Sequence, residues 1–408
     1  MLKLPTENTL DREEKIMVEW IDIFLSDILM DKGYIRGPFG SALKRGDMKE
    51  DGIPVYEQQH AIYNSRDFRY YIDEQKFNEM KRFQVKKDDL IISCSGTVGK
   101  VSIIKDDDPK GIISQALLLL RADTNKVLPL YLKYFFSSRE GYNAIVSRSS
   151  GSVQVNIAKR SVIEQIPLKL PQIKTQRKIV GVLSSIDEKI EENERINKNL
   201  EQQAVAVFNK YYNASKNQQP FTTLINVLGG GTPKTGNPEF WDGSIPFFTP
   251  KDVGTPYTFK TEKYITELGL KHCNSRLYPT NTTFVTARGT VGKISLAGAP
   301  MAMNQSCYAL TSEIVDPLLV YFYVFKAVNA LKHKASGAVF DAIVTRDFDG
   351  EIINILSDAD SEAALLIIKP MMEAIHNNSK ENMQLSTVRD TLLPKLMSGE
   401  IDVSNIDI

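Results

Sequence analysis

Apolar residues follow a strict 4-3-4-3 spacing in two stretches, about 174–212 and 361–397. The seam of the first stretch is Ile179, Leu183, Ile186, Ile190, Leu200, Ala204, Val207 and Tyr211. The seam of the second is Ile368, Met371, Ile375, Asn378, Asn382, Leu385, Arg389, Leu392 and Leu396. A mean spacing of 3.5 residues is that of a coiled coil. The pattern predicts two long helices, and their similar length favours a mutual coiled coil over two amphipathic helices that pack separately.

Two features within these seams lead to further predictions. Pro370 is tolerated only near the start of a helix, so the ordered part of the second helix is expected to begin there. Asparagines interrupt both seams near their middle, at Asn193, Asn197, Asn378 and Asn382. A buried asparagine without a partner costs about 1–3 kcal/mol, so we expect these four side chains to meet in one polar layer that fixes register. The alternative is that the seam rotates and the asparagines face water.

A long internal repeat accompanies the helices. The segment GTVGK at 96–100 recurs at 289–293, and shorter fragments recur in the same order, with an offset that drifts from 193 to 186. This period is too long for a solenoid and indicates two copies of one domain. Residues 20–170 and 220–356 should therefore share one fold.

Within each copy the pattern is mixed. Short β-rich runs such as Leu90–Ser93, Lys100–Ile104 and Thr283–Thr286 alternate with glycine turns, whereas Pro129–Ser138 and Pro317–Ala327 look helical. The predicted class is α+β, with two duplicated α/β domains and a pair of long helices. The predicted boundaries are 1–173 for the first domain, 174–216 for the first helix, 217–356 for the second domain, and 357–408 for the second helix and tail.

Composition narrows the function classes. The 408 residues include 50 Lys+Arg and 50 Asp+Glu, so the chain does not coat nucleic acid by charge alone, although local patches remain possible readers of sequence. Three cysteines without a C-x-x-C pair and four dispersed histidines predict neither a disulfide framework nor a metal site. The longest apolar run, Leu318–Phe325, is too short to cross a bilayer, and no signal core is present at the start, so we expect a cytoplasmic protein.

Several motifs resemble catalytic ones but depart from them. GTVGK has two residues between its glycines where a phosphate loop needs four before Gly-Lys, so it predicts a tight turn between strands. Gly229–Gly231 lacks the spacing of a dinucleotide loop, and Asn237–Phe240 lacks the second proline of the amino-methyltransferase box. Asp347, Asp349 and Glu351 are expected in a solvated turn. The chain is therefore predicted not to be an enzyme.

The chain resembles the specificity subunit of Type I restriction–modification enzymes. The residues that carry the resemblance are GGTPKT at 230–235 followed by FWDGSIPF at 240–247, GPFGSAL at 37–43, both GTVGK turns, IPLKLPQIKTQR at 166–177, and LLPKLMSGEI at 392–401. Within this match Asn237-Pro238 belongs to the recognition-domain segment. One departure is Leu356–Asp360, where the family has a Pro-Pro-Leu-x-x-Gln stretch; we expect a looser or asymmetric start to the second helix.

The resemblance implies a DNA-reading subunit. Each copy would be a target recognition domain for one half of a split sequence in double-stranded DNA, and the helices would form an antiparallel spacer. Two methyltransferase subunits would bring S-adenosylmethionine, and restriction or translocase subunits would bring ATP and magnesium; this chain itself would hold no cofactor. A non-catalytic scaffold that binds protein partners is the alternative.

Candidate DNA contacts are polar residues in equivalent loops of the two copies, where basic side chains meet phosphates and amides read base edges. In the first copy they are Lys44, Arg45, Gln58, Gln59, Tyr63, Arg148, Gln154 and Asn156. In the second copy they are Lys234, Thr249, Lys251, Asp252, Lys334 and Asp341.

Overall fold

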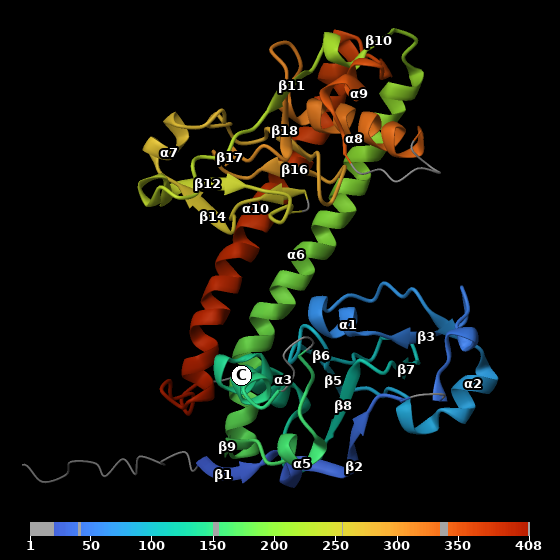
Figure 1. Ribbon diagram of the computed structural model, residues 1–408, viewed down its shortest axis with the longest axis vertical. Coiled ribbons are helices and arrows are strands. Elements are labelled where there is room, and N and C mark those ends of the chain that lie inside the picture. The colour runs from blue at the N-terminus through green and yellow to red at the C-terminus, as the bar shows by residue number, and fades with distance from the viewer. Residues whose placement is uncertain (1–19, 40–41, 150–154, 255, 335–341, 407–408) are drawn as a thin grey trace, which may run out of the picture. The chain divides into compact units, whose positions relative to one another are not determined.

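The computed structural model describes residues 20–39, 42–149, 155–254, 256–334 and 342–406, and divides into two compact units. Unit 1 is Met1–Ile186 with Val388–Ile408, and unit 2 is Asp187–Thr387. We call the part of unit 1 that precedes helix α6 domain 1, and the part of unit 2 between helices α6 and α10 domain 2 (Figure 1). Each domain combines sheets with helices, which confirms the α+β class.

Domain 1 contains three sheets. The largest is antiparallel in the order β2-β8-β5-β6, and its strands are Leu29–Arg36, Leu117–Ala122, Leu90–Ser93 and Val101–Ile103. The second has the order β4-β3-β7, with Tyr71–Ile72 antiparallel and Ile112–Ile113 parallel to the central Ile53–Tyr56. The third pairs β1 (Trp20–Phe24) with β9 (Pro167–Pro171). The helices are α1 to α5, at Gln58–Tyr63, Glu74–Glu79, Pro129–Ser137, Arg139–Val146 and Arg160–Ile163, and the 3-10 turns η1, η3 and η4 are Leu25–Ile28, Arg45–Asp47 and Lys81–Phe83.

Domain 2 repeats this plan. Its largest sheet has the order β11-β18-β15-β16-β13, with strands Asn226–Gly229, Cys307–Thr311, Thr283–Thr286, Ile294–Ala297 and Tyr257–Thr258. The second has the order β14-β12-β17, at Lys263–Ile265, Trp241–Phe248 and Ala302–Met303, and the third pairs β10 (Gln218–Pro220) with β19 (Ile352–Asn354). The helices α7 to α9 are Glu267–Lys271, Pro317–Lys334 and Thr345–Asp349, and the turns η5 and η6 are Phe221–Thr223 and Pro238–Phe240. Helix α8 packs across β15, β16 and β18 (Figure 1).

The two domains share the order and direction of their common strands and the turn geometry, which confirms the duplication, and domain 2 adds β13 beside β16. In both, the GTVGK glycines adopt positive φ in the hairpin between two adjacent strands of the largest sheet, at 66° and 86° for Gly96 and Gly99. The Gly99 N–H donates to the Ser93 carbonyl at 2.9 Å, and Gly292 donates to Thr286 at 2.8 Å. GTVGK is thus a tight turn, as its glycine spacing predicted.

Central strands are apolar on both faces because each face is covered. In β5, Leu90 and Ile92 belong to one buried cluster and Ile91 to another, and all three are fully buried. This alternation explains why the strand reads as an uninterrupted apolar run.

The long helices are α6 (Ile173–Ala214) and α10 (Asp358–Met397). The expectation that Pro370 opens the second helix is wrong: it lies inside α10, whose start is capped where the Ser357 hydroxyl accepts the Asp360 N–H at 3.2 Å. Although proline removes one helical hydrogen bond, fully buried residues on either side, Ile368 and Met372, hold the helix in place.

Of the expected looser or asymmetric start of α10, the looser packing is wrong. At its start Leu356 is 4% exposed and donates its N–H to the Tyr323 hydroxyl at 3.0 Å. At the start of α6 the fully buried Gln176 accepts from Leu128 N–H at 2.9 Å and donates to the Pro171 carbonyl at 2.9 Å. The two starts use different side chains, but both are fixed by buried hydrogen bonds, and the helices have 42 and 40 residues.

The four asparagines form one layer between α6 and α10 within unit 2. Asn193 donates to Asn382 at 2.8 Å, and Asn378 donates to Asn197 at 2.9 Å. Rising numbers on one helix meet falling numbers on the other, so the helices are antiparallel here. Asn193 and Asn197 are 1% and 7% exposed. The side chains therefore face the partner helix rather than water.

In unit 2 the buried face of each long helix differs from the predicted seam by one residue, near the C-terminal end of α6 and in the N-terminal half of α10. Phe208 is 1% exposed and Met372 is fully buried, whereas the neighbouring Val207 and Met371 are only partly buried. Phe208 stacks on Phe322 of α8, with ring centroids 5.3 Å apart. Packing against domain 2 thus displaces the 3.5-residue seam. Among the described residues, no helix is long and apolar enough to cross a membrane.

Candidate nucleic-acid interface

Five segments of domain 1 converge at one end of its largest sheet, and we call them loop cluster 1. They are 37–45, 57–66, 94–99, 114–116 and 155–157, as far as the structure describes them. Hydrogen bonds join them: Cys94 N–H donates to Ala116 at 2.9 Å, and Ile157 N–H donates to Cys94 at 2.9 Å. Ser95 N–H donates to the Gln58 side-chain oxygen at 3.0 Å. The cluster is therefore a connected surface rather than separate loops.

Domain 2 forms the same cluster from the equivalent segments, and we call it loop cluster 2. They are 230–237, 249–254, 287–292, 304–306 and 342–343, as far as the structure describes them. Ala287 N–H donates to Ser306 at 2.8 Å, and Ile343 N–H donates to Ala287 at 2.9 Å, which repeats the bonds of Cys94 in domain 1. Thr232 and Gln305 are joined through their side chains.

In the first segment of each cluster, one glycine packs closely against the backbone of the segment that precedes strand β8 in domain 1 or β18 in domain 2. A Cβ at Gly37 would lie 2.0 Å from the Ser114 carbonyl oxygen, and one at Gly230 would lie 2.1 Å from that of Asn304. Backbone contacts this close admit only glycine. This explains glycine at the same point of both copies.

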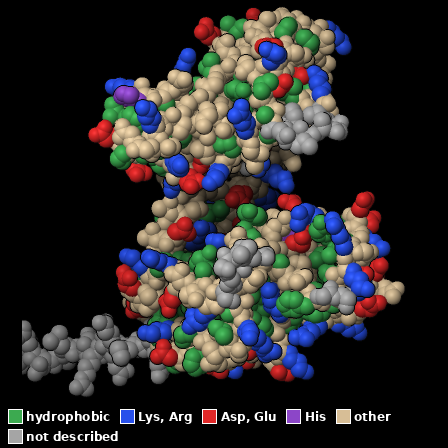
Figure 2. Space-filling view, viewed as in Figure 1, with side chains coloured by type: hydrophobic (Ala, Val, Ile, Leu, Met, Phe, Trp, Pro, Cys, Tyr) green, Lys and Arg blue, Asp and Glu red, His purple; other side chains and the backbone are tan. Residues whose placement is uncertain are grey.

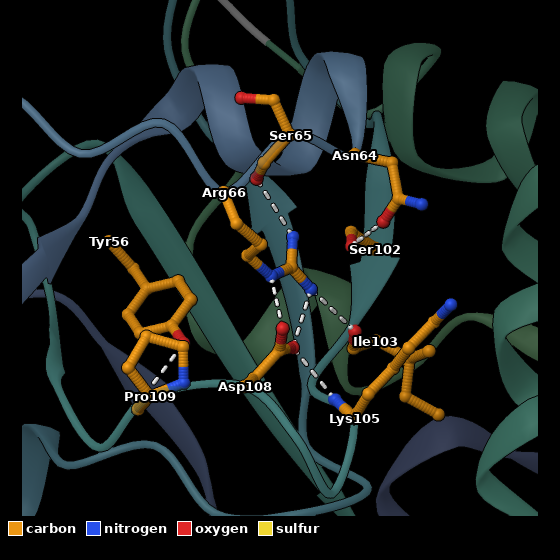
Figure 3. A network of polar contacts seen from close by, with 9 residues as sticks. All are labelled: Tyr56, Asn64, Ser65, Arg66, Ser102, Ile103, Lys105, Asp108 and Pro109. Atoms are coloured by element: carbon orange, nitrogen blue, oxygen red, sulfur yellow. Dashed lines mark hydrogen bonds and ion pairs between the residues drawn. The ribbon is translucent and has the colours of Figure 1, made fainter. Parts of the chain in front are cut away.

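Helix α1 gives loop cluster 1 its distinctive shape, and a polar network fixes the end of that helix (Figure 3). The Arg66 guanidinium donates to both Asp108 oxygens at 2.7 Å and to the Ile103 carbonyl at 2.9 Å. The Ser102 hydroxyl donates to Asn64, which ends α1 in the left-handed conformation at φ 51°. The Asp108 side chain is 8% exposed, so this pair is shielded from solvent. The network ties the end of α1 to the β6–β7 connection.

The His60 side chain also fixes helix α1, through contacts with the backbone on both sides of it. It is fully buried; its Nδ1 accepts the Glu57 N–H at 2.6 Å, and its Nε2 lies 3.1 Å from the Asp67 carbonyl oxygen. These partners require the tautomer that carries its proton on Nε2. Burial lowers the pKa of the imidazole below its usual value, because the charged form would lose its hydration.

Domain 2 has a compact turn where domain 1 has α1. The Asp252 carboxylate accepts Thr249 N–H at 2.8 Å, the Thr249 hydroxyl at 2.6 Å and Glu262 N–H at 2.7 Å. Three local donors occupy this carboxylate, so its role in the structure is to shape the turn. Thr249 is committed to the same turn, and DNA contacts by these two residues stay untested predictions.

The other predicted contacts of domain 1 divide by accessibility. Tyr63 is 76% exposed, and Lys44, Arg45 and Asn156 are exposed on the cluster. Gln58, Gln59 and Arg148 are partly buried and bonded to Ser95 N–H, the Asp67 carbonyl and the Ala144 carbonyl. The first group is exposed to solvent, whereas Gln58 and Gln59 of the second group support the loops and Arg148 bonds back to helix α4. Gln154 lies outside the described residues.

In domain 2, Lys234 and Lys251 are exposed on the cluster, and Lys251 lies 3.6 Å from Glu262. Lys334 instead pairs with Glu351, which is 4% exposed. Glu351 therefore does not lie in a solvated turn, as the acidic trio had suggested, because it is buried, with its carbonyl bonded to Phe221 N–H and its carboxylate paired with Lys334 of α8. Asp341 lies outside the described residues.

Two residues of the clusters, Phe39 and Arg288, were missed by sequence reasoning. Phe39 is 60% exposed and lies 5.6 Å from the Arg36 guanidinium, and Arg288 is exposed beside the second GTVGK turn. Their positions in the sequence could have identified them, because each lies in or next to a repeated motif. Figure 2 shows Lys and Arg interspersed with Asp and Glu on the visible faces, consistent with zero net charge. Across the described ranges, no group of three or more His, Cys, Asp or Glu could hold a metal ion.

Comparisons with known proteins agree on one family. The model described as "Type I restriction modification DNA specificity domain" matches residues 19–202 and 222–384. The MjaIX specificity subunit of Methanocaldococcus jannaschii is 28% identical over 40% of this chain and 39% of its own length. The HindI specificity subunit of Haemophilus influenzae is 22% identical over 78% of this chain and 87% of its own. A crystal structure of a Type I restriction-modification S subunit from M. genitalium has the same fold, with a TM-score of 0.57 and 14% sequence identity. The match covers 95% of this chain and 98% of that one.

Proposed function

Since the chain belongs to the Type I restriction modification DNA specificity family, we propose that it reads a two-part DNA sequence, one half with each loop cluster. The observation that supports this most directly is the duplication. Two copies of one scaffold present loops at the same end, and the loops differ in structure between the copies. A duplicated scaffold with divergent loops suits two different half-sites.

The chemistry of the clusters fits base and backbone contacts. The exposed cations Lys44, Arg45, Lys234 and Lys251 suit phosphates, which fix register without reading sequence. Tyr63, Asn156 and Arg288 are exposed beside them and offer the hydrogen-bonding groups that read base edges. Gln58 and Thr249 stabilise the loops through side-chain hydrogen bonds.

The antiparallel pair α6 and α10 sets the separation of the half-sites in this proposal. A buried asparagine layer specifies helix register, because a shifted pairing would leave its amides unsatisfied. One heptad is about 10 Å of helix, near three base pairs, so register matters for spacing.

Catalysis is assigned to partners. We propose that two methyltransferase subunits supply S-adenosylmethionine and that restriction or translocase subunits supply ATP and magnesium, whereas this chain is non-catalytic and cytoplasmic. The relatives named above are specificity subunits of restriction enzymes, which supports partners of this kind.

The test is to sequence methylated bases in cells that express this chain with its methyltransferase subunits. We expect one bipartite motif with a constant gap. Tyr63→Ala should relax the half read by domain 1 only, and Arg288→Ala the half read by domain 2 only. Lys87→Ala, on a residue outside both clusters, is the control and should leave both halves unchanged.

A complex that assembles but shows no sequence preference would contradict this proposal. That result would favour the scaffold, in which both domains bind only protein.

A further inference from the structure

A strongly basic pocket lies along β2, the edge strand of the four-stranded sheet in domain 1. Its volume is about 450 Å³. Its cationic lining residues are Lys32, Lys81, Arg82, Lys86, Arg121 and Arg160, and Asp31 is the one acid in its lining. The chain as a whole has no net charge, so the pocket is a local departure from the average.

Two of the cations are held in fixed positions. The Arg121 guanidinium donates to the two oxygens of Asp89 at 2.7 and 2.6 Å, and the Asp89 side chain is 1% exposed. Arg160 donates to Glu164 at 2.8 Å and lies 5.3 Å from the centre of the Tyr34 ring. These residues give the pocket a preformed wall, which reduces the ordering cost of binding a ligand.

The other four cations are not held by side-chain partners. Lys32, Lys81, Arg82 and Lys86 are exposed, and their side chains make no ion pair or hydrogen bond within the described ranges. Six positive charges face three negative ones, on Asp31, Asp89 and Glu164. Like charges gathered in this way favour binding of an anion.

The backbone is strained at the same place. Lys32 has φ 58°, and the pairing of β2 with β8 shifts register between Leu29 and Tyr34. A left-handed non-glycine residue costs about 1–2 kcal/mol, and such strain concentrates at functional sites. A bulge of this kind re-aims side chains.

Domain 2 repeats one of these charges, because the match of Ile157 with Ile343 places Arg346 at the position of Arg160, but it lacks four of the others. The bond from Val85 N–H to Gly111 matches that from Tyr278 N–H to Met301, and this match aligns the two segments. Asn274, Ser275 and Pro279 then stand at the positions of Lys81, Arg82 and Lys86, and Thr311 stands at that of Arg121. The shared scaffold therefore does not require these four cations.

We propose that this pocket binds a backbone phosphate of the DNA whose bases meet loop cluster 1, an inference that rests on the proposed function. Arg121 lies four residues along β8 from Leu117 at the cluster, about 13 Å at ~3.3 Å per residue. That distance is about four base pairs of DNA.

The lining favours DNA over an acidic protein. The pocket's two apolar side chains, Tyr34 and Ile35, are each 4% exposed, so charged side chains form most of its accessible lining. Protein interfaces have an apolar centre, whereas DNA interfaces are polar and strongly positive. Guanidinium groups also match phosphate geometry.

The experiment compares two neighbouring lysines in the full complex with its methyltransferase subunits. Lys86→Gln removes a pocket cation, and Lys87→Gln removes a lysine that lies 3.2 Å from Asp106 outside the pocket. Binding to a duplex with the cognate site and to a random duplex is measured from 50 to 300 mM salt. We expect Lys86→Gln and the K81Q/R82Q double variant each to reduce the slope of log affinity against log salt, by up to about 0.9 for the loss of one phosphate contact, equally for both duplexes.

The control should keep the wild-type slope and motif. A methylphosphonate about four base pairs outside the half-site should weaken wild-type binding but not binding by the double variant. Unchanged slopes with intact sequence preference would overturn the pocket assignment and leave the proposed function standing. Loss of methyltransferase association at an unchanged DNA slope would assign the pocket to a protein partner instead.

Discussion

The two domains share a scaffold, yet they build the second segment of their loop clusters differently. Domain 1 uses helix α1, fixed by the Arg66–Asp108 pair and the buried His60. Domain 2 uses a short turn around the Asp252 carboxylate. The strands beneath, the GTVGK hairpins and the glycines that lock the first segment are the same in both.

This difference shows where variation is tolerated. Main-chain hydrogen bonds and close backbone contacts carry the scaffold, and they depend little on side chains other than glycine. The loops rest on a few polar side chains, so they can change without altering the sheet. A reader of two unlike half-sites needs that separation of roles.

The strongest test of the shared scaffold uses the locking glycines. Gly37→Ala and Gly230→Ala should each destabilise the chain by about 3 kcal/mol or more, because the new Cβ meets a carbonyl oxygen and the backbone must shift. Each should also abolish recognition of its own half-site. Denaturant unfolding and methylation sequencing measure the two effects.

The controls are Gly46→Ala in domain 1 and Gly236→Ala in domain 2, where a Cβ would meet nothing within 4 Å. A large loss at Gly37 with none at Gly230 would contradict the equivalence of the clusters.

The Arg66–Asp108 pair that supports α1 can be disrupted without changing domain 2. Asp108→Asn should cost about 2–3 kcal/mol, because it leaves the guanidinium of Arg66 in a shielded site without its counter-charge. Recognition by domain 1 should weaken while domain 2 keeps its half-site. Asp106→Asn removes an exposed carboxylate beside Lys87 and should cost less than about 0.5 kcal/mol. Equal effects of the two substitutions on unfolding would disprove the role of the network.

The asparagine layer tests the helices that both domains share. Asn193→Ala should cost about 1–2 kcal/mol, since Asn382 loses a partner in a largely buried site. Replacing both Asn193 and Asn382 with leucine should restore stability but relax register. Methylation sequencing would then show more than one gap length between the half-sites. A single unchanged gap would argue against a register role.

The smallest expected effect is a pH dependence confined to domain 1. The folded-state pKa of His60 is lowered, so its stabilising contribution is present above the ordinary histidine pKa near 6.5 and is lost as pH falls through that value toward the folded-state pKa. We expect the free energy of unfolding to fall as pH drops below about 6.5. His60→Gln should flatten this part of the profile, whereas the exposed His272→Gln should not. An identical slope in wild type and His60→Gln would refute it.

Local patterns in the sequence were sufficient for the repeat, the two helices and the class of fold. They are encoded by neighbouring residues: the 3.5-residue seam marks α6 and α10, and the recurring GTVGK marks equivalent hairpins. Asn193 and Asn382 also had to find partners wherever they were buried, because an unpaired amide is costly in any fold.

The details that depend on distant contacts were decided only by the tertiary structure. Pro370 lies within a helix because residues buried around it compensate for the missing hydrogen bond, and Phe208 replaces Val207 on the buried face because α8 packs there. Glu351 is buried because Lys334 reaches it, and the cations on η4, β8 and α5 meet at one edge only after the sheet has formed. Sequence spacing reports what a residue contacts along its own element, whereas charge pairing and pocket formation depend on which elements the fold brings together.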